Sequence, residues 1–237
     1  MESDDDDNVC GLAFMFDAQH HKALQTYELE NNIKVSIKMI SDTPGHVQSG
    51  QYLWPAAISA SNYLIENWQN LRSVNVLELG AGCGFTGIVA RKLQQKDDIS
   101  GSSRVIFTDY DPGALTLINE NIELNGLSST ETNYMRWGEA VPDEIRAMHR
   151  YPMEGFNLIV GADLLYCLGV VQPLFTTVAA ILAQDGKFLL VTSFGLDNSI
   201  ESEINDACRS RCLVREEKIA LDENNGICRV ELYFRTE

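Results

Sequence analysis

The sequence predicts an α/β fold in which a doubly wound, mostly parallel sheet of seven strands is covered by helices on both faces. Two observations carry this prediction. From about residue 71 onward, short and almost continuously apolar runs alternate with segments of helical spacing, which is typical of parallel strands buried on both faces. Near the C-terminal end, apolar and polar residues alternate after the turn sequence DENNG (222–226), which indicates an antiparallel hairpin.

The N-terminal part is predicted to add a β-hairpin and a helix to this sheet. Two apolar-rich runs, 24–29 and 33–40, flank a polar triplet, and the second run alternates apolar and polar side chains as a strand does. Over residues 55–68, apolar residues recur at helical spacing, and Pro55 suits the first turn of a helix.

The elements of the sheet and its covering helices follow in chain order. Asp111 is a good helix N-cap before Pro112, and Gly126 suits the end of the same helix. The predicted strands are residues 74–79, 104–109, 133–137, 156–162, 187–193, 213–220 and 229–234. The predicted helices are residues 85–95, 112–126, 170–183 and 200–212.

One domain is expected over residues 21–237, made of the hairpin and helix (21–70) and the seven-strand core (71–237). Residues 1–20, with a run of four aspartates, are predicted to form an acidic, solvated and disordered tail. A chain of 237 residues is long enough to bury a sizeable core.

Composition and charge exclude several classes of partner. A net charge of −16 argues against nucleic acid, because phosphate binding needs a basic surface. It suits a basic protein partner or serves solubility. No apolar run of about 18 residues predicts a membrane span, and the six cysteines show no zinc-site spacing, so no metal is expected. The acidic N-terminus lacks the pattern of a secretory signal, so we expect a monomer in the cytoplasm, or also in the nucleus.

The segment VLELGAGCGFTG (76–87) is the most informative stretch of the chain. The end of an apolar strand is followed by glycines at alternate positions and by an apolar helix start, and such a turn lets the backbone approach a ligand closely. Read from Gly82, it matches the dinucleotide fingerprint, and Asp109 lies 22 residues past Gly87, where a ribose-binding acid is expected. A nicotinamide or flavin oxidoreductase is therefore one interpretation.

Two details favour a different ligand. Two small residues precede Gly82, so the turn starts at Gly80, and Phe85 then takes the position of the third fingerprint glycine. Glu78 at the end of the strand would repel a pyrophosphate, but it suits a ligand with a cationic end. S-adenosylmethionine has a sulfonium, an ammonium and a ribose but no phosphate, and Asp109 can accept its ribose hydroxyls.

With these residues the chain resembles the class I, seven-strand, Rossmann-like methyltransferases that use S-adenosylmethionine. A narrower resemblance, over about residues 45–195, is to the methyltransferase-like lysine methyltransferases (methyltransferase family 16). The motifs that carry it are WPAA (54–57), LELGAGCGFTGI (77–88), FTDYD (107–111), NIELNG (121–126), RWG (136–138) and ADLLY (162–166).

The resemblance implies a set of cofactor-binding residues around the glycine turn. They are Trp54, Glu78, Gly80, Ala81, Gly82, Asp109, Trp137 and Ala162. Asp109 would bind the ribose, and Trp137 would lie by the adenine. Two interpretations of Glu78 stand side by side, direct contact with the cofactor or support of the turn from behind.

The motif Asp163-x-x-Tyr166 is the predicted catalytic part of the site. It follows an apolar strand, so it belongs at the edge where open α/β sheets bind ligands. In the family it replaces the Asn-Pro-Pro-Tyr motif of amide and nucleobase methyltransferases, and a carboxylate attracts a protonated lysine. The alternatives are that Asp163 caps the following helix and that Tyr166 only packs.

The sequence therefore predicts an S-adenosylmethionine-dependent protein methyltransferase that modifies a lysine ε-amine. Arginine or histidine acceptors, a small-molecule amine, and a non-catalytic partner-binding protein of the same fold remain as alternatives. The family's substrates include chaperones and elongation factors, so a cytosolic protein substrate of that kind is expected.

Overall fold

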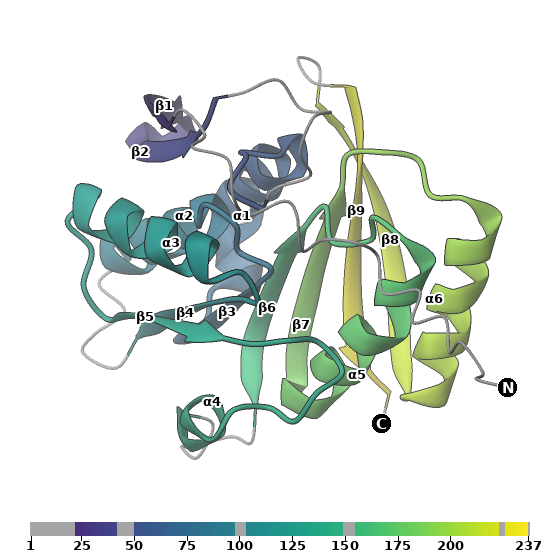
Figure 1. Ribbon diagram of the computed structural model, residues 1–237. Helices are drawn as coiled ribbons and strands as arrows, with labels where there is room; N and C mark the ends of the chain where they lie inside the picture. Colours follow the sequence, from purple (N-terminus) through teal and green to yellow (C-terminus); the bar gives the residue numbers. More distant parts are fainter. Residues whose placement is uncertain (1–21, 42–49, 98–102, 149–154, 223–225, 237) are drawn as a thin grey trace, which may run out of the picture.

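The computed structural model describes residues 22–41, 50–97, 103–148, 155–222 and 226–236, and it shows a seven-stranded sheet between two layers of helices (Figure 1). The sheet order is β5-β4-β3-β6-β7-β9-β8. The strands are β3 (Asn75–Leu79), β4 (Arg104–Asp109), β5 (Thr130–Tyr134), β6 (Phe156–Ala162), β7 (Leu182–Thr192), β8 (Leu213–Asp222) and β9 (Gly226–Arg235). Strands β5, β4, β3, β6 and β7 run parallel, whereas β9 is antiparallel to both β7 and β8. The predicted doubly wound α/β fold with a C-terminal antiparallel hairpin is confirmed.

Helices cover both faces because alternate residues of the central strands point to opposite sides. One apolar cluster packs Val76, Val105 and Leu158 under α1 (Pro55–Leu71), α2 (Phe85–Lys96) and α3 (Pro112–Leu124). A second cluster packs the intervening residues under α5 (Val171–Ile181) and α6 (Asn198–Ser210), with the short α4 (Asp143–Met148) beside it. No helix in the described ranges is long and apolar enough to cross a membrane.

Most elements lie where the sequence predicts them, and the exceptions have physical reasons. Strand β5 covers Thr130–Tyr134 rather than 133–137, because this edge strand is polar and half-exposed and therefore lacks an apolar pattern. Strand β7 begins at Leu182, five residues before the predicted start, because Leu182 pairs with Phe156 ahead of an irregular polar stretch. For the same reason α5 ends at Ile181 and not at 183. Helix α4 was not predicted at all.

Further boundaries differ by only a few residues. Helix α1 runs to Leu71, three residues past its predicted end, and α6 starts and ends two residues early. The predicted cap of α3 is confirmed, because the Asp111 side chain accepts a hydrogen bond from the Gly113 N–H at 2.8 Å. The predicted acidic tail (1–20) lies outside the described residues.

The predicted N-terminal hairpin is confirmed as β1 (Lys22–Leu29) and β2 (Ile33–Ile40), joined by a short 3-10 turn. The apolar side chains of β2, at Ile33, Val35 and Ile37, belong to the same cluster as α1, α2 and α3. The hairpin is therefore packed against the sheet's covering helices (Figure 1).

Asn121 of α3 and Asn125, the residue that caps the end of α3, take the place of a neighbouring strand along the outer edge of β2. The Asn121 side chain accepts from the Lys38 N–H at 2.7 Å and donates to the Lys38 carbonyl at 3.0 Å. Asn125, one turn further along α3, makes the same pair of bonds with the N–H and carbonyl of Ser36, at 3.1 and 2.6 Å. The Asn121 amide also donates to the carbonyl of Cys83 at 2.9 Å, inside the glycine turn.

We predict that Asn121→Ala lowers the free energy of unfolding by about 2–3 kcal/mol, because several buried backbone groups lose their partner. Urea unfolding followed by circular dichroism measures the change. Asn119→Ala, at an exposed position of the same helix, is the matched control and should change stability by less than about 0.5 kcal/mol. Equal effects of the two substitutions would contradict this role of Asn121.

Candidate active site

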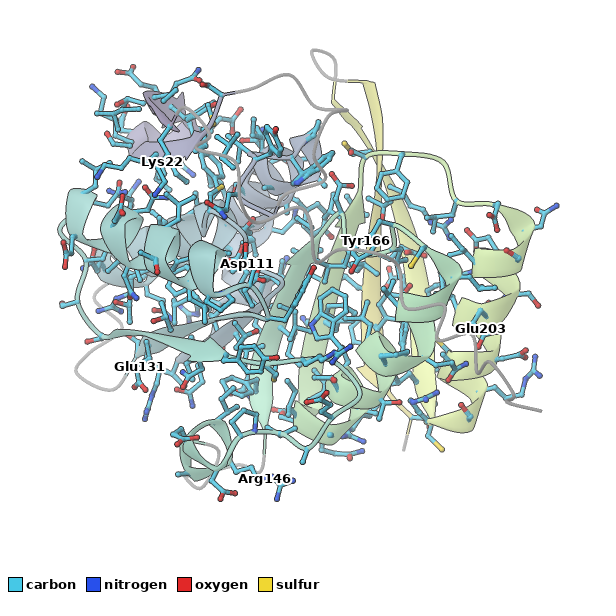
Figure 2. All side chains as sticks on the ribbon, in the orientation of Figure 1. Lys22, Asp111, Glu131, Arg146, Tyr166 and Glu203 are labelled. Carbon is cyan, nitrogen blue, oxygen red and sulfur yellow. The ribbon has the colours of Figure 1, made fainter. Side chains whose placement is uncertain are left out.

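The candidate active site lies where the strand order reverses. Strands β4 and β5 follow β3 on one side of it, and β6 and β7 lie on the other. In open α/β sheets ligands bind at the carboxyl ends of the strands at this point. The segments that leave β3, β4, β6 and β7 here carry most of the residues that the sequence singles out, and Figure 2 shows Asp111 on the α3 side of this edge and Tyr166 on the β7 side.

The glycine turn between β3 and α2 begins at Gly80, as the sequence indicates. Gly80, Gly82 and Gly84 have φ of 55°, 57° and 79°, a left-handed conformation that favours glycine. A Cβ on Gly80 would come within 2.8 Å of Leu164 and 3.0 Å of the Trp137 ring. The turn, the segment after β5 and the segment after β6 therefore meet around Gly80.

Asp109 at the end of β4 holds this turn from the side. Its Oδ2 accepts from the Gly82 N–H at 2.9 Å, and its Oδ1 accepts from the Asp111 N–H at 2.9 Å. Burial raises the pKa of the Asp109 carboxyl, although these two bonds oppose the effect. Each carboxylate oxygen has a second lone pair, so Asp109 can accept further donors, such as two hydroxyls.

Glu78 lies behind the turn and caps α2. The residue is 3% exposed, and its carboxyl accepts from the Gly87 N–H at 2.9 Å, one of the N–H groups that a helix start leaves unpaired. Gly84, at the N-cap position, has no side chain for this task. Burial raises the pKa of Glu78 to about 8. Of the two interpretations of Glu78, this geometry favours support of the turn.

A strap of residues 50–54 lies along the glycine turn. Its Gln51 carbonyl accepts from the Ile40 N–H at 3.1 Å, and its Gln51 amide donates to Asp111 at 3.2 Å. Trp54 is half-buried at the start of α1, with its ring edge-on to Tyr52 at a centroid distance of 6.2 Å. The strap thus brings Trp54 to the same edge as the turn.

Asp163 connects three segments at the end of β6. Its carboxylate accepts from the N–H and the hydroxyl of Ser193, both at 2.7 Å, and from the Ala56 N–H at 3.3 Å. The residue has a φ of 54°, a conformation that is uncommon for a side chain larger than glycine and is found often at functional sites. Burial raises the pKa of the Asp163 carboxyl, and the bonds from Ser193 and Ala56 lower it.

The alternative that Asp163 caps the helix after it is wrong. The helix whose first turn it caps is α1, through Ala56 in the WPAA motif. Its neighbour Ala162 is half-buried opposite Val191 of β7, and Tyr166 is 51% exposed.

The structure therefore gathers the predicted cofactor and catalytic residues at one edge, while their chemical roles stay predictions. Sequence reasoning missed Ser193 and Gln51. The only signal for Ser193 is its position at the end of an apolar run, and Gln51 lies in a polar stretch without a recognisable pattern.

Comparison with known proteins now decides the family. Residues 32–201 match the lysine methyltransferase family. The chain belongs to this family. It is 34% identical over 143 residues to the protein N-terminal and lysine N-methyltransferase EFM7 of Cryptococcus neoformans. The matched region covers 58% of the chain and 44% of that protein. It is 28% identical over 142 residues to the histone-arginine methyltransferase METTL23 of Mus musculus, over 60% of the chain and 51% of that protein.

The chain thus spans about half the length of these relatives. A putative RNA methyltransferase from Pyrococcus horikoshii superposes with a TM-score of 0.57 at 13% identity, over 85% of the chain and 94% of that structure, which supports the fold. Membership in this family, together with its fold, implies S-adenosylmethionine as cofactor and decides against the oxidoreductase interpretation.

We predict that Glu78→Gln flattens the pH dependence of stability. The folded-state pKa near 8 lies above the unfolded value near 4.5, so the contribution of Glu78 is full below about pH 4.5 and is lost as pH rises through 8. Between pH 6 and 8 the wild-type chain should lose about 2 kcal/mol that the variant keeps.

Urea unfolding at several pH values measures this difference. Glu144→Gln, which removes an exposed carboxylate from α4, is the control and should follow the wild-type curve. Parallel curves for Glu78→Gln and the wild type would show that Glu78 ionises normally in the folded protein.

Proposed function

We propose that this protein is an S-adenosylmethionine-dependent methyltransferase that modifies a lysine ε-amine of a protein. The observation that carries the proposal is the Asp163 carboxylate, which is fixed at the sheet edge by Ser193 and Ala56 beside the glycine turn. The family and the names of its members support a protein acceptor.

The residues around the turn fit this cofactor. Gly80 and Gly82 let other segments pack directly on the turn, Leu164 and Trp137 against Gly80 and the Gly50 carbonyl against Gly82, so these segments border the place where the methionine and ribose portions would lie. Asp109 has lone pairs for two ribose hydroxyls, and Trp137 lies against Gly80, at the side where the adenine is expected. The Asp109 carboxyl suits a ligand that offers hydroxyl donors and carries no phosphate. When bound, S-adenosylmethionine supplies a methyl group activated by the sulfonium, and S-adenosylhomocysteine is the product.

Asp163 has the position and charge to receive the acceptor. A free lysine has a pKa of about 10.4, so its amine arrives protonated and is attracted by the carboxylate. Three hydrogen bonds already hold Asp163, and one of its roughly four lone-pair sites is left for the ammonium. The amine, after loss of a proton to water, would be the nucleophile for the activated methyl group that the bound cofactor would supply. Positioning of this kind can supply about 7–11 kcal/mol of the acceleration.

An arginine acceptor is the second candidate, because one relative is named a histone-arginine methyltransferase. A guanidinium would also be attracted by Asp163. Identification of the modified side chain separates the two candidates.

We predict that Asp109→Asn weakens S-adenosylmethionine binding about ten- to a hundredfold, since hydrogen bonds to a charged group contribute about 1.5–3 kcal/mol. Isothermal titration calorimetry with S-adenosylmethionine and S-adenosylhomocysteine measures the change. Asp143→Asn, at an exposed position of α4, is the control and should bind as the wild type does. If the wild-type chain binds neither ligand, the proposed function is wrong.

We predict that Asp163→Asn abolishes methyl transfer but keeps the fold and cofactor binding. An asparagine side chain keeps one oxygen for the Ser193 N–H, and its amide group can donate to the Ser193 hydroxyl. It loses the charge that attracts the amine and the long bond from the Ala56 N–H, so circular dichroism and cofactor titration of the variant accompany the assay. The assay incubates the chain with cell extract and S-adenosylmethionine carrying a labelled methyl group, and mass spectrometry then identifies the labelled protein and residue.

Asp197→Asn is the matched control, because it removes an exposed carboxylate at the start of α6, on the same edge of the sheet. It should transfer methyl groups at the wild-type rate. Wild-type turnover in Asp163→Asn would refute the role of Asp163, and labelling of small molecules alone would refute a protein substrate.

A further inference from the structure

Exposed aromatic side chains gather at one edge of the sheet. Among the described residues, four large aromatic side chains are exposed: Tyr110, Tyr134, Tyr166 and Phe194. Tyr110 directly follows β4, Tyr134 ends β5, Tyr166 comes four residues after β6, and Phe194 comes two residues after β7. All four therefore belong to the carboxyl edge, where the candidate site lies. Rings of this size gain much from burial, so their gathering at one edge indicates a binding surface.

Two of these aromatic residues lie on the segments that meet at Asp163. Tyr166 is three residues beyond it on the same segment. Phe194 directly follows Ser193, whose N–H and hydroxyl both bind the Asp163 carboxylate at 2.7 Å. Because consecutive Cα atoms are about 3.8 Å apart, these bonds fix the backbone of Phe194 beside the carboxylate. Strands β6 and β7 are neighbours, with Ala162 opposite Val191, so both aromatic residues leave adjacent strand ends.

The charges around this corner favour a cation. The arginines of the neighbouring strands, Arg215 and Arg229, are paired with Glu201 at the start of α6 and with the buried Glu231. Their positive charge is therefore compensated within the protein. Asp163 remains as a carboxylate on the segment of Tyr166, bonded to the residue before Phe194. A carboxylate next to aromatic faces suits an alkylammonium group, which gains both an ion pair and a cation–π contact.

We propose that Phe194 and Tyr166 are the aromatic walls of the acceptor entrance and determine its specificity for an alkylammonium group held over Asp163. The proposal rests on the proposed function, and it adds the residue Phe194 and a chemical preference to it. A quaternary methylammonium is the best ligand for such walls, because its charge is spread over methyl groups that pack on the rings. The entrance should thus prefer a methylated lysine side chain over a neutral one of the same shape.

Binding of two matched probes tests this preference. The first is Nα-acetyl-trimethyllysine amide, and the second is its neutral isostere with carbon in place of the ammonium nitrogen. Titrations of the full chain, with and without S-adenosylhomocysteine, are followed by ligand-detected NMR. The wild-type chain should bind the cationic probe at least about threefold more tightly than the neutral one.

Substitutions at Phe194 distinguish an effect of the aromatic ring from an effect of side-chain size. Phe194→Leu keeps an apolar side chain without a ring and should remove the preference, whereas Phe194→Tyr should keep it. Phe194 is 40% exposed, so both variants should keep the wild-type melting temperature. Tyr134→Leu, which removes another exposed ring of the same sheet edge, on the far side of β4, is the control and should keep the preference.

A preference that persists in Phe194→Leu, or a wild-type chain that does not distinguish the two probes at any concentration, overturns the inference. Failure of the proposed function has a different signature. A chain that shows the ring-dependent preference and transfers no methyl group to protein supports the aromatic entrance and refutes the enzyme. If the wild-type chain and Phe194→Leu methylate a protein lysine equally well, and neither prefers the cationic probe over the neutral one, the aromatic entrance alone is refuted.

Discussion

Three carboxylates hold together the backbone at the carboxyl edge of the sheet. Loops that leave parallel strands carry N–H groups without a strand or helix partner, and these groups need acceptors when they are buried. Glu78 accepts from Gly87, Asp109 accepts from Gly82 and from the residue two positions after itself, and Asp163 accepts from Ser193 and Ala56. Each carboxylate thus ties its own strand end to another segment of the chain.

The same arrangement makes the charge at this edge depend on what is bound there. Burial raises the pKa values of all three carboxyls, which favours their neutral forms in the protein alone. A bound cation favours the charged forms, and both the sulfonium cofactor and a lysine acceptor are cations. The groups that order the loops are therefore the groups that favour cationic ligands. The net charge of the chain, −16, also favours cations. Carboxylate-to-amide substitutions are informative here because they remove the charge while keeping one of the two acceptor oxygens.

Much of the fold and part of the site could be predicted from sequence because both rest on local patterns. Strands β4 and β6 are continuous apolar runs and lie at the predicted residues, and the glycine turn starts at the predicted Gly80. Strand β5 and helix α4 are short, polar and near the surface, so pairing and packing rather than pattern decide where they form. Ser193 could not be found in the same way, because its partnership with Asp163 spans 30 residues and depends on the register of β6 and β7.

The N-terminal hairpin is connected to the far side of the glycine turn by side-chain hydrogen bonds of the same kind. Asn121 satisfies the outer edge of β2 at Lys38 and, with the same amide group, the Cys83 carbonyl within the turn. An amide serves here where a carboxylate could not, since two of the three partners are acceptors and need donors. The turn is thus held by an acceptor, Asp109, on one side and by a donor, Asn121, on the other. The hairpin, although outside the seven-stranded sheet, is in this way part of the support of the cofactor site.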